Sequence, residues 1–221
     1  MQFETQRLII RPWQPNKDAR QAMDIFGDAQ VMAWVDGDER DTSIRQVQGR
    51  LQSYRDYTIC GQSMGCGRSM GSWAVEKKDT RRVIGHVMLM LMPDMRVTPT
   101  HRRRLYSSIS SKISPKISSP DASSRKEGRD KEGLPTDYFE ICWQFRPSSW
   151  GFGYASEAAT RVMQYAFEEL NLPMVLAITQ PENRRSVALA QRLGMENDGL
   201  TTRCYGGEPL LLYKLCSRQV G

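Results

Sequence analysis

Hydrophobic and polar positions along this chain follow two patterns, and each predicts a set of elements. Apolar residues recur at helical spacing over residues 18–35, 44–57, 154–170 and 184–193. Short apolar or alternating stretches typical of strands occupy residues 7–13, 72–77, 82–92, 138–146, 174–179 and 210–215, with one more strand just before the last of these. Helices that precede a run of strands, followed by strand–helix–strand–helix–strand, predict a single α/β domain around one mixed sheet, spanning residues 4–216.

One segment, residues 97–135, departs from both patterns. It is rich in Ser and Pro and carries nine Lys/Arg against four Asp/Glu, a net +5 of the chain's +6. Such a composition cannot bury enough apolar surface to offset its ordering entropy, so we interpret it as a disordered insertion within the domain. Contact between its basic run and a phosphate backbone or an acidic partner is the alternative. The sequence pI of 9.2 comes mostly from this segment. The high pI is therefore weak evidence that the domain binds nucleic acid.

Composition excludes several classes of function. No apolar run approaches the roughly 20 residues that a membrane helix needs, and the charged, alternating start resembles a strand more than a signal peptide. The five cysteines are scattered without a C-x-x-C pair, which favours a reducing, cytoplasmic setting over a disulfide scaffold or a zinc site. With two histidines, His86 and His101, a histidine triad or metal cluster is not expected. The chemistry therefore has to use carboxylates, hydroxyls, backbone amides or a cofactor.

The stretch WGFGYASEAA places two glycines, Gly151 and Gly153, directly before a predicted helix. The first turn of a helix has unpaired N–H groups and the positive end of the dipole, and glycine lets a bulky diphosphate approach those amides. The alternative is that both glycines only shape a tight strand-to-helix turn. The third glycine of a dinucleotide-binding fingerprint is missing, which disfavours a Rossmann dehydrogenase.

A second stretch, TQPENRRSVALAQRLGM, runs from a strand end into a helix with Asn183 at its start and Gly194 after its end. Both residues fit helix caps. Together with ETQRLIIRPW and EICWQFRPSSWGFGYASEAA, this stretch resembles the GNAT acetyltransferases, and among them the branch of ribosomal-protein N-terminal acetyltransferases (the Rim type). The resemblance spans residues 4–215 apart from the insertion.

The resemblance implies an α/β fold whose central sheet is mixed, mostly antiparallel and flanked by helices, with a long insertion between the family's third and fourth strands. It also implies that acetyl-CoA lies between the strand ending at Arg146 and the strand ending at Thr179. The pyrophosphate would bind backbone amides of the turn, the pantetheine arm would bind the backbone near Phe145, and Asn183 would hydrogen-bond that arm. The turn residues concerned are Gly151, Phe152, Gly153, Tyr154 and Ala155. Ser148 stands where the family usually has a glutamine or arginine, so one side-chain contact to phosphate is in doubt.

Acyl transfer needs a base for the amine and a donor for the departing thiolate. Many relatives supply a tyrosine donor at the position of Ala190, so that donor is missing here. Ser186, one turn earlier, is similar to the Rim-type serine and is our candidate, with a simple first-turn helix residue as the alternative. Glu140 is the candidate base, acting through water, and a strand-edge carboxylate in solvent is its alternative.

Two functional hypotheses follow from the sequence. The first is an acetyl-CoA-dependent N-acetyltransferase in which a protein N-terminal amine or a small-molecule amine attacks the thioester directly. The second is a non-catalytic GNAT-fold protein that binds acyl-CoA and uses its basic insertion to contact a nucleic acid or an acidic partner. The sequence names no metal, leaves monomer and homodimer open, and argues against a membrane partner.

Overall fold

The computed structural model describes residues 1–35, 40–63, 70–92, 138–202, 204 and 207–217. The predicted insertion at residues 97–135 lies outside these ranges, so its disorder stays a prediction.

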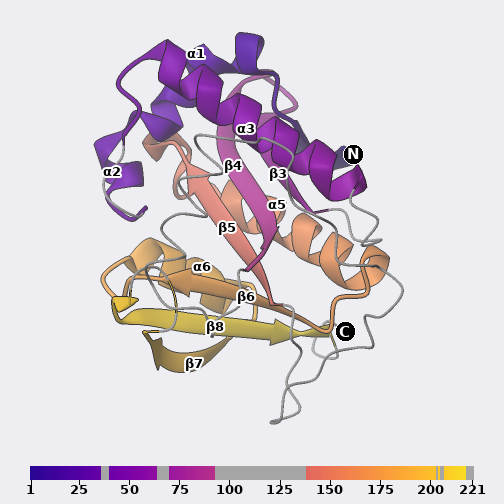
Figure 1. Cartoon of the computed structure of the whole chain (residues 1–221), viewed down its shortest axis with the longest axis vertical. Helices are drawn as coiled ribbons and strands as arrows, with labels where there is room; N and C mark the ends of the chain where they lie inside the picture. Colours follow the sequence, from indigo (N-terminus) through magenta and orange to yellow (C-terminus); the bar gives the residue numbers. More distant parts are fainter. Residues whose placement is uncertain (36–39, 64–69, 93–137, 203, 205–206, 218–221) are drawn as a thin grey trace, which may run out of the picture.

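The described residues form one eight-stranded sheet in the order β1-β2-β3-β4-β5-β6-β8-β7. Its strands are β1 (Phe3–Glu4), β2 (Leu8–Pro12), β3 (Gly71–Lys77), β4 (Val83–Leu91), β5 (Phe139–Phe145), β6 (Met174–Thr179), β7 (Glu196–Thr201) and β8 (Leu210–Cys216). Every neighbouring pair is antiparallel except β5 and β6, which run parallel (Figure 1). The expected mixed, mostly antiparallel sheet is confirmed.

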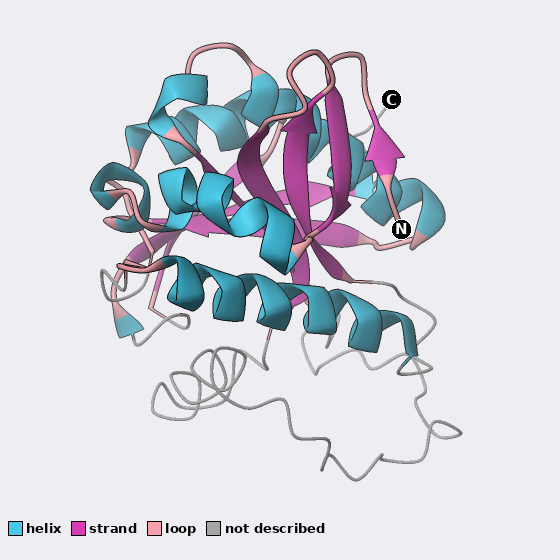
Figure 2. Ribbon diagram, turned by 90° about the horizontal axis from the view of Figure 1, so that it is seen from above, coloured by secondary structure: helices cyan, strands magenta, loops and turns pink. Residues whose placement is uncertain are grey.

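Helices cover both faces of this sheet. They are α1 (Pro15–Phe26), α2 (Ala29–Met32), α3 (Ile44–Ser63), α5 (Tyr154–Gln164), a π-helical continuation (Tyr165–Glu169) and α6 (Arg184–Arg192). Figure 2 shows the sheet between two layers; α1 and α3 pack on one face, while α5 and α6 pack on the other. No helix in the described ranges is long and apolar enough to cross a membrane.

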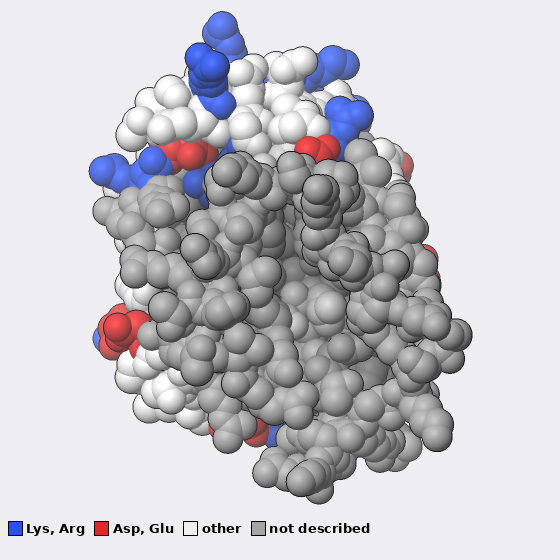
Figure 3. All heavy atoms as spheres, viewed as in Figure 1, with Lys and Arg blue, Asp and Glu red and all other residues white. Residues whose placement is uncertain are grey.

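The face seen from the side of α1 carries charges of both signs. Lys and Arg side chains stand along its upper edge over α1, with Asp and Glu side chains between and below them (Figure 3). Over its described residues this face therefore offers no continuous basic surface of the kind that a phosphate backbone attracts.

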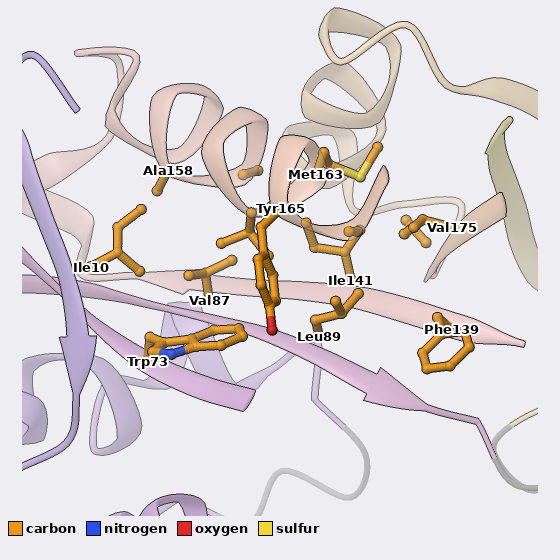
Figure 4. Close-up of a cluster of buried hydrophobic side chains, with 14 of the residues drawn as sticks. Ile10, Trp73, Val87, Leu89, Phe139, Ile141, Ala158, Met163, Tyr165 and Val175 are labelled. Atoms are coloured by element: carbon orange, nitrogen blue, oxygen red, sulfur yellow. The ribbon is translucent and has the colours of Figure 1, made fainter. Parts of the chain in front are cut away.

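The larger core lies between the sheet and α5. Ala158 and Ala159 are fully buried, and their small side chains let the helix approach the strands closely. Beyond them, Tyr165 reaches down to Trp73 of β3 in an edge-on ring contact with centroids 6.3 Å apart (Figure 4). Burying side chains of this size contributes about 1.5–3 kcal/mol each, which fixes α5 and therefore the turn that precedes it.

Three local features differ from the predicted elements. The single helix expected over residues 18–35 is two helices, because the Asp28 carboxylate accepts from the N–H groups of Gln30 and Val31 and begins α2 anew. The first strand is preceded by the two-residue β1, which is too short to show a period. The helix from Tyr154 ends in a π-helical turn, in which the Leu170 N–H donates to the Tyr165 carbonyl.

Candidate active site

The two parallel strands β5 and β6 touch at one end and then separate. Their ladder in the described chain is the single pair Glu140 and Leu176, and the strands diverge toward their carboxyl ends (Figure 1). The Arg146 N–H donates to the Ile84 carbonyl of β4. Because backbone groups alternate along a strand, the N–H groups of residues 143 and 145 point the other way, toward β6. This edge of β5 therefore faces the opening with backbone donors and acceptors.

A glycine turn lies at the carboxyl end of β5. Gly151 has φ +85° and Gly153 has φ +78°, a region that residues with a side chain rarely adopt, so the turn itself requires glycine. A Cβ built on Gly151 would meet nothing within 4 Å, so the turn is also open on its outer side. The two interpretations of the glycines are thus compatible.

The N-terminus of α5 has no side-chain cap. Its N-cap is Gly153, and the first intrahelical bond runs from the Glu157 N–H to the Gly153 carbonyl. The amides of Tyr154, Ala155 and Ser156 therefore lie ahead of the helical ladder at the positive end of the dipole. A diphosphate is the type of group that such amides bind.

An ion pair from the connection between β1 and β2 supports this turn. The Glu157 carboxylate accepts hydrogen bonds from the Thr5 hydroxyl, the Arg7 backbone N–H at 2.8 Å and the Arg7 Nε at 2.6 Å. The same guanidinium donates from NH1 to the Phe152 carbonyl at 2.9 Å. Burial alone raises the pKa of Glu157, but these bonds outweigh it and hold that pKa below its ordinary value. The carboxylate is therefore ionised, paired and directed away from the open amides.

The two aromatic residues of the turn have different surroundings. Phe152 is 61% exposed, and its ring stacks on that of Tyr154. Arg7 lies over the Tyr154 ring at 4.6 Å, and the Lys77 ammonium lies 5.4 Å from it. Both cations are paired with a carboxylate, Arg7 with Glu157 at 2.6 Å and Lys77 with Asp79 at 3.0 Å, so they order the aromatic side of the turn without adding net charge to it.

Trp150 closes the end of β5. Its indole Nε1 donates to the Phe145 carbonyl at 2.7 Å, and Arg185 of α6 lies 4.1 Å above the Trp150 ring. The Phe145 ring lies over Gly85 of β4, where an added Cβ would come within 2.4 Å of it. Both the side chain and the carbonyl of Phe145 are thus engaged, which leaves its N–H as the group that can hold a pantetheine arm.

The start of α6 is capped, as the sequence predicted. The Asn183 Oδ1 accepts from the Ser186 N–H at 3.2 Å, and Gly194 follows the helix at φ +77°. The Ser186 hydroxyl accepts from the Trp143 indole Nε1 at 3.1 Å, across the opening from β5. Ala190 is 1% exposed in the main core and carries only a methyl group, so it supplies no hydrogen-bond donor.

Glu140 lies on a central strand and is 2% exposed, so the alternative of a strand-edge carboxylate in solvent is wrong. Its side chain points to the α1/α3 face, opposite to that of Trp143, because side chains alternate along β5. Burial, the charge of Glu140 and a hydrogen bond to it raise the pKa of the neighbouring Cys142 thiol well above its ordinary value. Cys142 is therefore a neutral thiol and a poor nucleophile.

A buried polar chain lies next to this face. The Ser72 hydroxyl and the Gln144 Oε1 flank the two ring nitrogens of His86 at 2.8 and 3.0 Å. Burial lowers the pKa of His86 to about 4, so the ring is neutral at pH 7. Ser72 has no exposed surface, and no substrate can reach its hydroxyl. Ser72, His86 and Gln144 resemble a catalytic triad only in that a histidine lies between two polar side chains. Their hydrogen bonds satisfy buried polar groups.

The model of the acetyltransferase (GNAT) domain family matches residues 7–108 and 121–196, which is most of the chain. The protein belongs to the GNAT acetyltransferase family. Enzymes of this family use acetyl-CoA, so the expected fold, donor and N-acetyltransferase class are confirmed at the level of the family. The uncharacterized N-acetyltransferase YnaD of Bacillus subtilis is 41% identical over 66 residues, covering 30% of this chain and 39% of YnaD. The uncharacterized N-acetyltransferase YoaA of the same organism is 23% identical over 198 residues, covering 90% and 84% of the two chains.

Solved structures share the fold over nearly the whole chain. An acetyltransferase (GNAT family) from Bacillus anthracis superimposes with TM-score 0.67 at 18% identity, covering 99% of both chains. RimL, a ribosomal alpha-N-protein acetyltransferase in complex with coenzyme A, has TM-score 0.63 at 11% identity over 98% of both chains. These likenesses establish the fold, and the Rim-type acceptor belongs to the proposal below.

Four residues of the site were missed by sequence reasoning. Arg7 and Glu157 support the glycine turn, while Trp143 and Trp150 reach across its flank. A signal for the first two was present, because the ETQRL and ASEAA stretches both belong to the resemblance. No spacing signal exists for the tryptophans, since their contacts with Ser186 and Arg185 depend on how α6 packs beside the end of β5.

Proposed function

We propose that this protein transfers the acetyl group of acetyl-CoA to a primary amine, either a protein N-terminus or a small-molecule amine, by direct attack on the thioester. The observation that carries the proposal is the continuity of the diverging β5–β6 pair with the uncapped start of α5. The open edge of β5 offers backbone donors and acceptors to the amide groups of the pantetheine arm. The start of α5 offers backbone N–H groups to the diphosphate.

In this proposal the turn residues 151–155 hold the diphosphate through backbone N–H groups, and the Phe145 N–H holds the pantetheine arm. Arg7 holds the turn in place through the Phe152 carbonyl and the Glu157 carboxylate, so the backbone donors stay in position although Ser148 supplies no long side chain to the phosphate. Asn183 caps α6 through Oδ1, and its amide NH₂ remains a donor for the arm.

The acetyl-CoA thioester supplies an activated carbonyl. Glu140 draws the proton from the amine through water, on the α1/α3 side of β5, while Ser186 lies on the opposite side and donates to the departing sulfur. Holding amine and thioester together removes a large entropic barrier, so positioning contributes much of the rate. The neutral thiol of Cys142 supports direct attack in place of an acetylated cysteine.

A reducing, cytoplasmic setting fits Cys142, Cys204 and Cys216, which are thiols in the described chain. A likeness to RimL favours a peptide with a free α-amine as the first acceptor to try. The non-catalytic alternative is supported by no contact among the described residues.

Calorimetric titration with acetyl-CoA, followed by release of CoA thiol over a panel of amines, tests the proposal. The panel contains short peptides with a free α-amine, the same peptides with a blocked N-terminus, and small primary amines. Saturable binding with turnover on at least one free amine is expected. Saturable binding without turnover on any amine, or no binding at all, would overturn the proposal.

A further inference from the structure

Trp143 spans the opening between β5 and α6. Its ring packs partly buried against the main core, and its indole Nε1 donates to the Ser186 hydroxyl oxygen at 3.1 Å. An indole N–H can only donate, so the hydroxyl must act as the acceptor in this bond. The direction of the Ser186 hydroxyl is therefore constrained by a residue of another element.

Ser186 is held a second time through its backbone, because its N–H donates to the Asn183 Oδ1. Neither bond uses the hydroxyl hydrogen. Among the described residues that hydrogen has no acceptor, although a serine in a first helical turn commonly returns it to nearby backbone. The Ser186 side chain thus keeps one donor available on the side of the opening.

We propose that Trp143 is a positioning residue, whose indole N–H selects the Ser186 rotamer that offers the hydroxyl hydrogen to the sulfur of CoA. The inference rests on the proposed function and deepens it. As the amine nitrogen bonds to the carbonyl carbon, the C–S bond breaks and its electron pair stays on sulfur, which accepts the hydrogen bond from Ser186. The proton lost by the amine passes to Glu140 through water.

The position of Ala190 explains why a bridge of this kind is needed. The family's donor at that position lies on α6, whereas Ala190 is buried and has no polar group. A serine is short and has three staggered rotamers of similar energy, so an unassisted Ser186 would spend much of its time turned away. A donor fixed on β5 removes that freedom.

The test needs only CoA and no acceptor. The thiolate absorbance of bound CoA is followed against pH, which gives the pKa of its thiol. Wild-type protein is expected to lower this pKa below that of free CoA. Ser186→Ala and Trp143→Phe are each expected to raise it again by about one unit, a tenfold change in the dissociation constant of the proton. The double variant should add nothing, because both changes remove the same hydrogen bond.

Two controls separate positioning from simple packing. Trp73→Phe removes an indole from the same core without contact to Ser186 and should leave the thiol pKa unchanged. Acetyl-CoA has no titratable thiol, so its affinity for Trp143→Phe should remain within about twofold of wild type, whereas a merely structural role would weaken it. Arg184 and Arg185, which directly precede Ser186, are kept in every variant, so their electrostatic effect on the thiol pKa is constant.

The inference is overturned if wild type leaves the thiol pKa unchanged, if Trp143→Phe behaves like wild type, or if the two single effects add. In each of those outcomes CoA still binds. The proposed acetyl transfer is then decided separately, by the calorimetric titration and the amine panel. Failure to bind CoA at all would instead overturn the proposed function together with the inference.

Discussion

Two helices, α5 and α6, begin at the opening between β5 and β6, and they treat their first amides differently. Helix α5 starts at Gly153 with φ +78° and no side-chain cap, while α6 starts at Asn183, whose Oδ1 accepts from the Ser186 N–H. A cap normally satisfies orphan donors and contributes about 1 kcal/mol. The chain therefore gives up this stabilisation at α5, where a ligand can take its place, and keeps it at α6, where it orients a side chain.

The supporting residues differ in the same way. At α5 the support comes from outside the helix, through Arg7 of the β1–β2 connection, which bonds to Glu157 and to the Phe152 carbonyl. At α6 it comes from within, through the cap, and from Trp143. The arrangement at α5 leaves backbone N–H donors exposed, which matches the binding role proposed for it. The arrangement at α6 fixes the Ser186 hydroxyl, which matches the chemical role proposed for it.

Filling the open turn should have the largest effect. Gly153→Val forces a β-branched residue into φ +78° and displaces the amides of the turn, so acetyl-CoA affinity should fall by about 100-fold or more, the equivalent of two charge-assisted hydrogen bonds. Calorimetric titration measures the loss.

Gly153→Asn is the matched control, because asparagine tolerates the left-handed region better than valine. It should retain more affinity than the valine variant. Wild-type affinity in Gly153→Val would show that neither the conformation nor the openness of this turn matters for the cofactor.

Removing the external support should have a moderate effect. Arg7→Gln loses the donor to the Phe152 carbonyl and the pair with Glu157, so acetyl-CoA affinity should fall about tenfold, roughly 1.4 kcal/mol. The Arg7 side chain is 43% exposed, so the free energy of unfolding should change by less than about 1 kcal/mol.

The exposed pair of Lys78 with Glu4 provides a control on the same edge of the sheet. Lys78→Gln should change neither affinity nor stability measurably. An equal loss of affinity in both variants would mean that Arg7 acts only through net charge.

The capped helix should respond in stability first. Asn183→Ala removes the cap and should cost about 1 kcal/mol in the free energy of unfolding, measured by urea titration, whereas Asn183→Asp keeps an acceptor and should cost less. Asp lacks the NH₂ donor, so if the Asn183 amide holds the cofactor arm, Asn183→Asp should bind acetyl-CoA less tightly despite its stability. Unchanged affinity in Asn183→Asp would leave Asn183 as a cap only.

Acid should weaken the start of α5 before that of α6. This is the smallest of the four predicted effects. The pKa of Glu157 lies below its ordinary 4.5, so the bonds that it accepts are present above that value and are lost as pH falls through the lower folded-state pKa. The amide of Asn183 does not titrate. Hydrogen exchange, corrected for intrinsic rates, should lose protection at the amides of Arg7 and Glu157, which donate to the Glu157 carboxylate and to the Gly153 carbonyl, at a higher pH than at the amides of residues 186–187. Simultaneous loss would show that the Glu157 pair does not stabilise the start of α5.

The elements of this fold could largely be read from the sequence, because each has a clear local signal. The strand over residues 174–179 and the helix from Arg184 coincide with those of the structure. The break at Asp28 was missed since Ile25 and Phe26 before it and Ala29 and Met32 after it follow one helical period. The π-helical turn was missed since one extra residue per turn leaves no mark in a period of this length.

The site was predictable in part. Residues that act through their backbone, such as Gly151 and Gly153, can be recognised in the sequence because few other residues adopt φ near +80°. Residues that act through a contact across the opening cannot, because Trp143 of β5 and Ser186 of α6 are 43 positions apart in sequence and meet only in the folded chain. The burial of Glu140 likewise depends on its place in the middle of the sheet.

The nearly unpaired boundary between β5 and β6 has a consequence for how this protein can change over generations. Strands in a ladder are fixed about 4.8 Å apart by their hydrogen bonds, so their spacing cannot drift. At this boundary the described chain holds one ladder pair, and beyond it β5 is joined to α6 by the Trp143 bond to Ser186. Substitutions there change the width of the opening without breaking further strand pairs, so that width can vary while each half of the sheet keeps its own ladder.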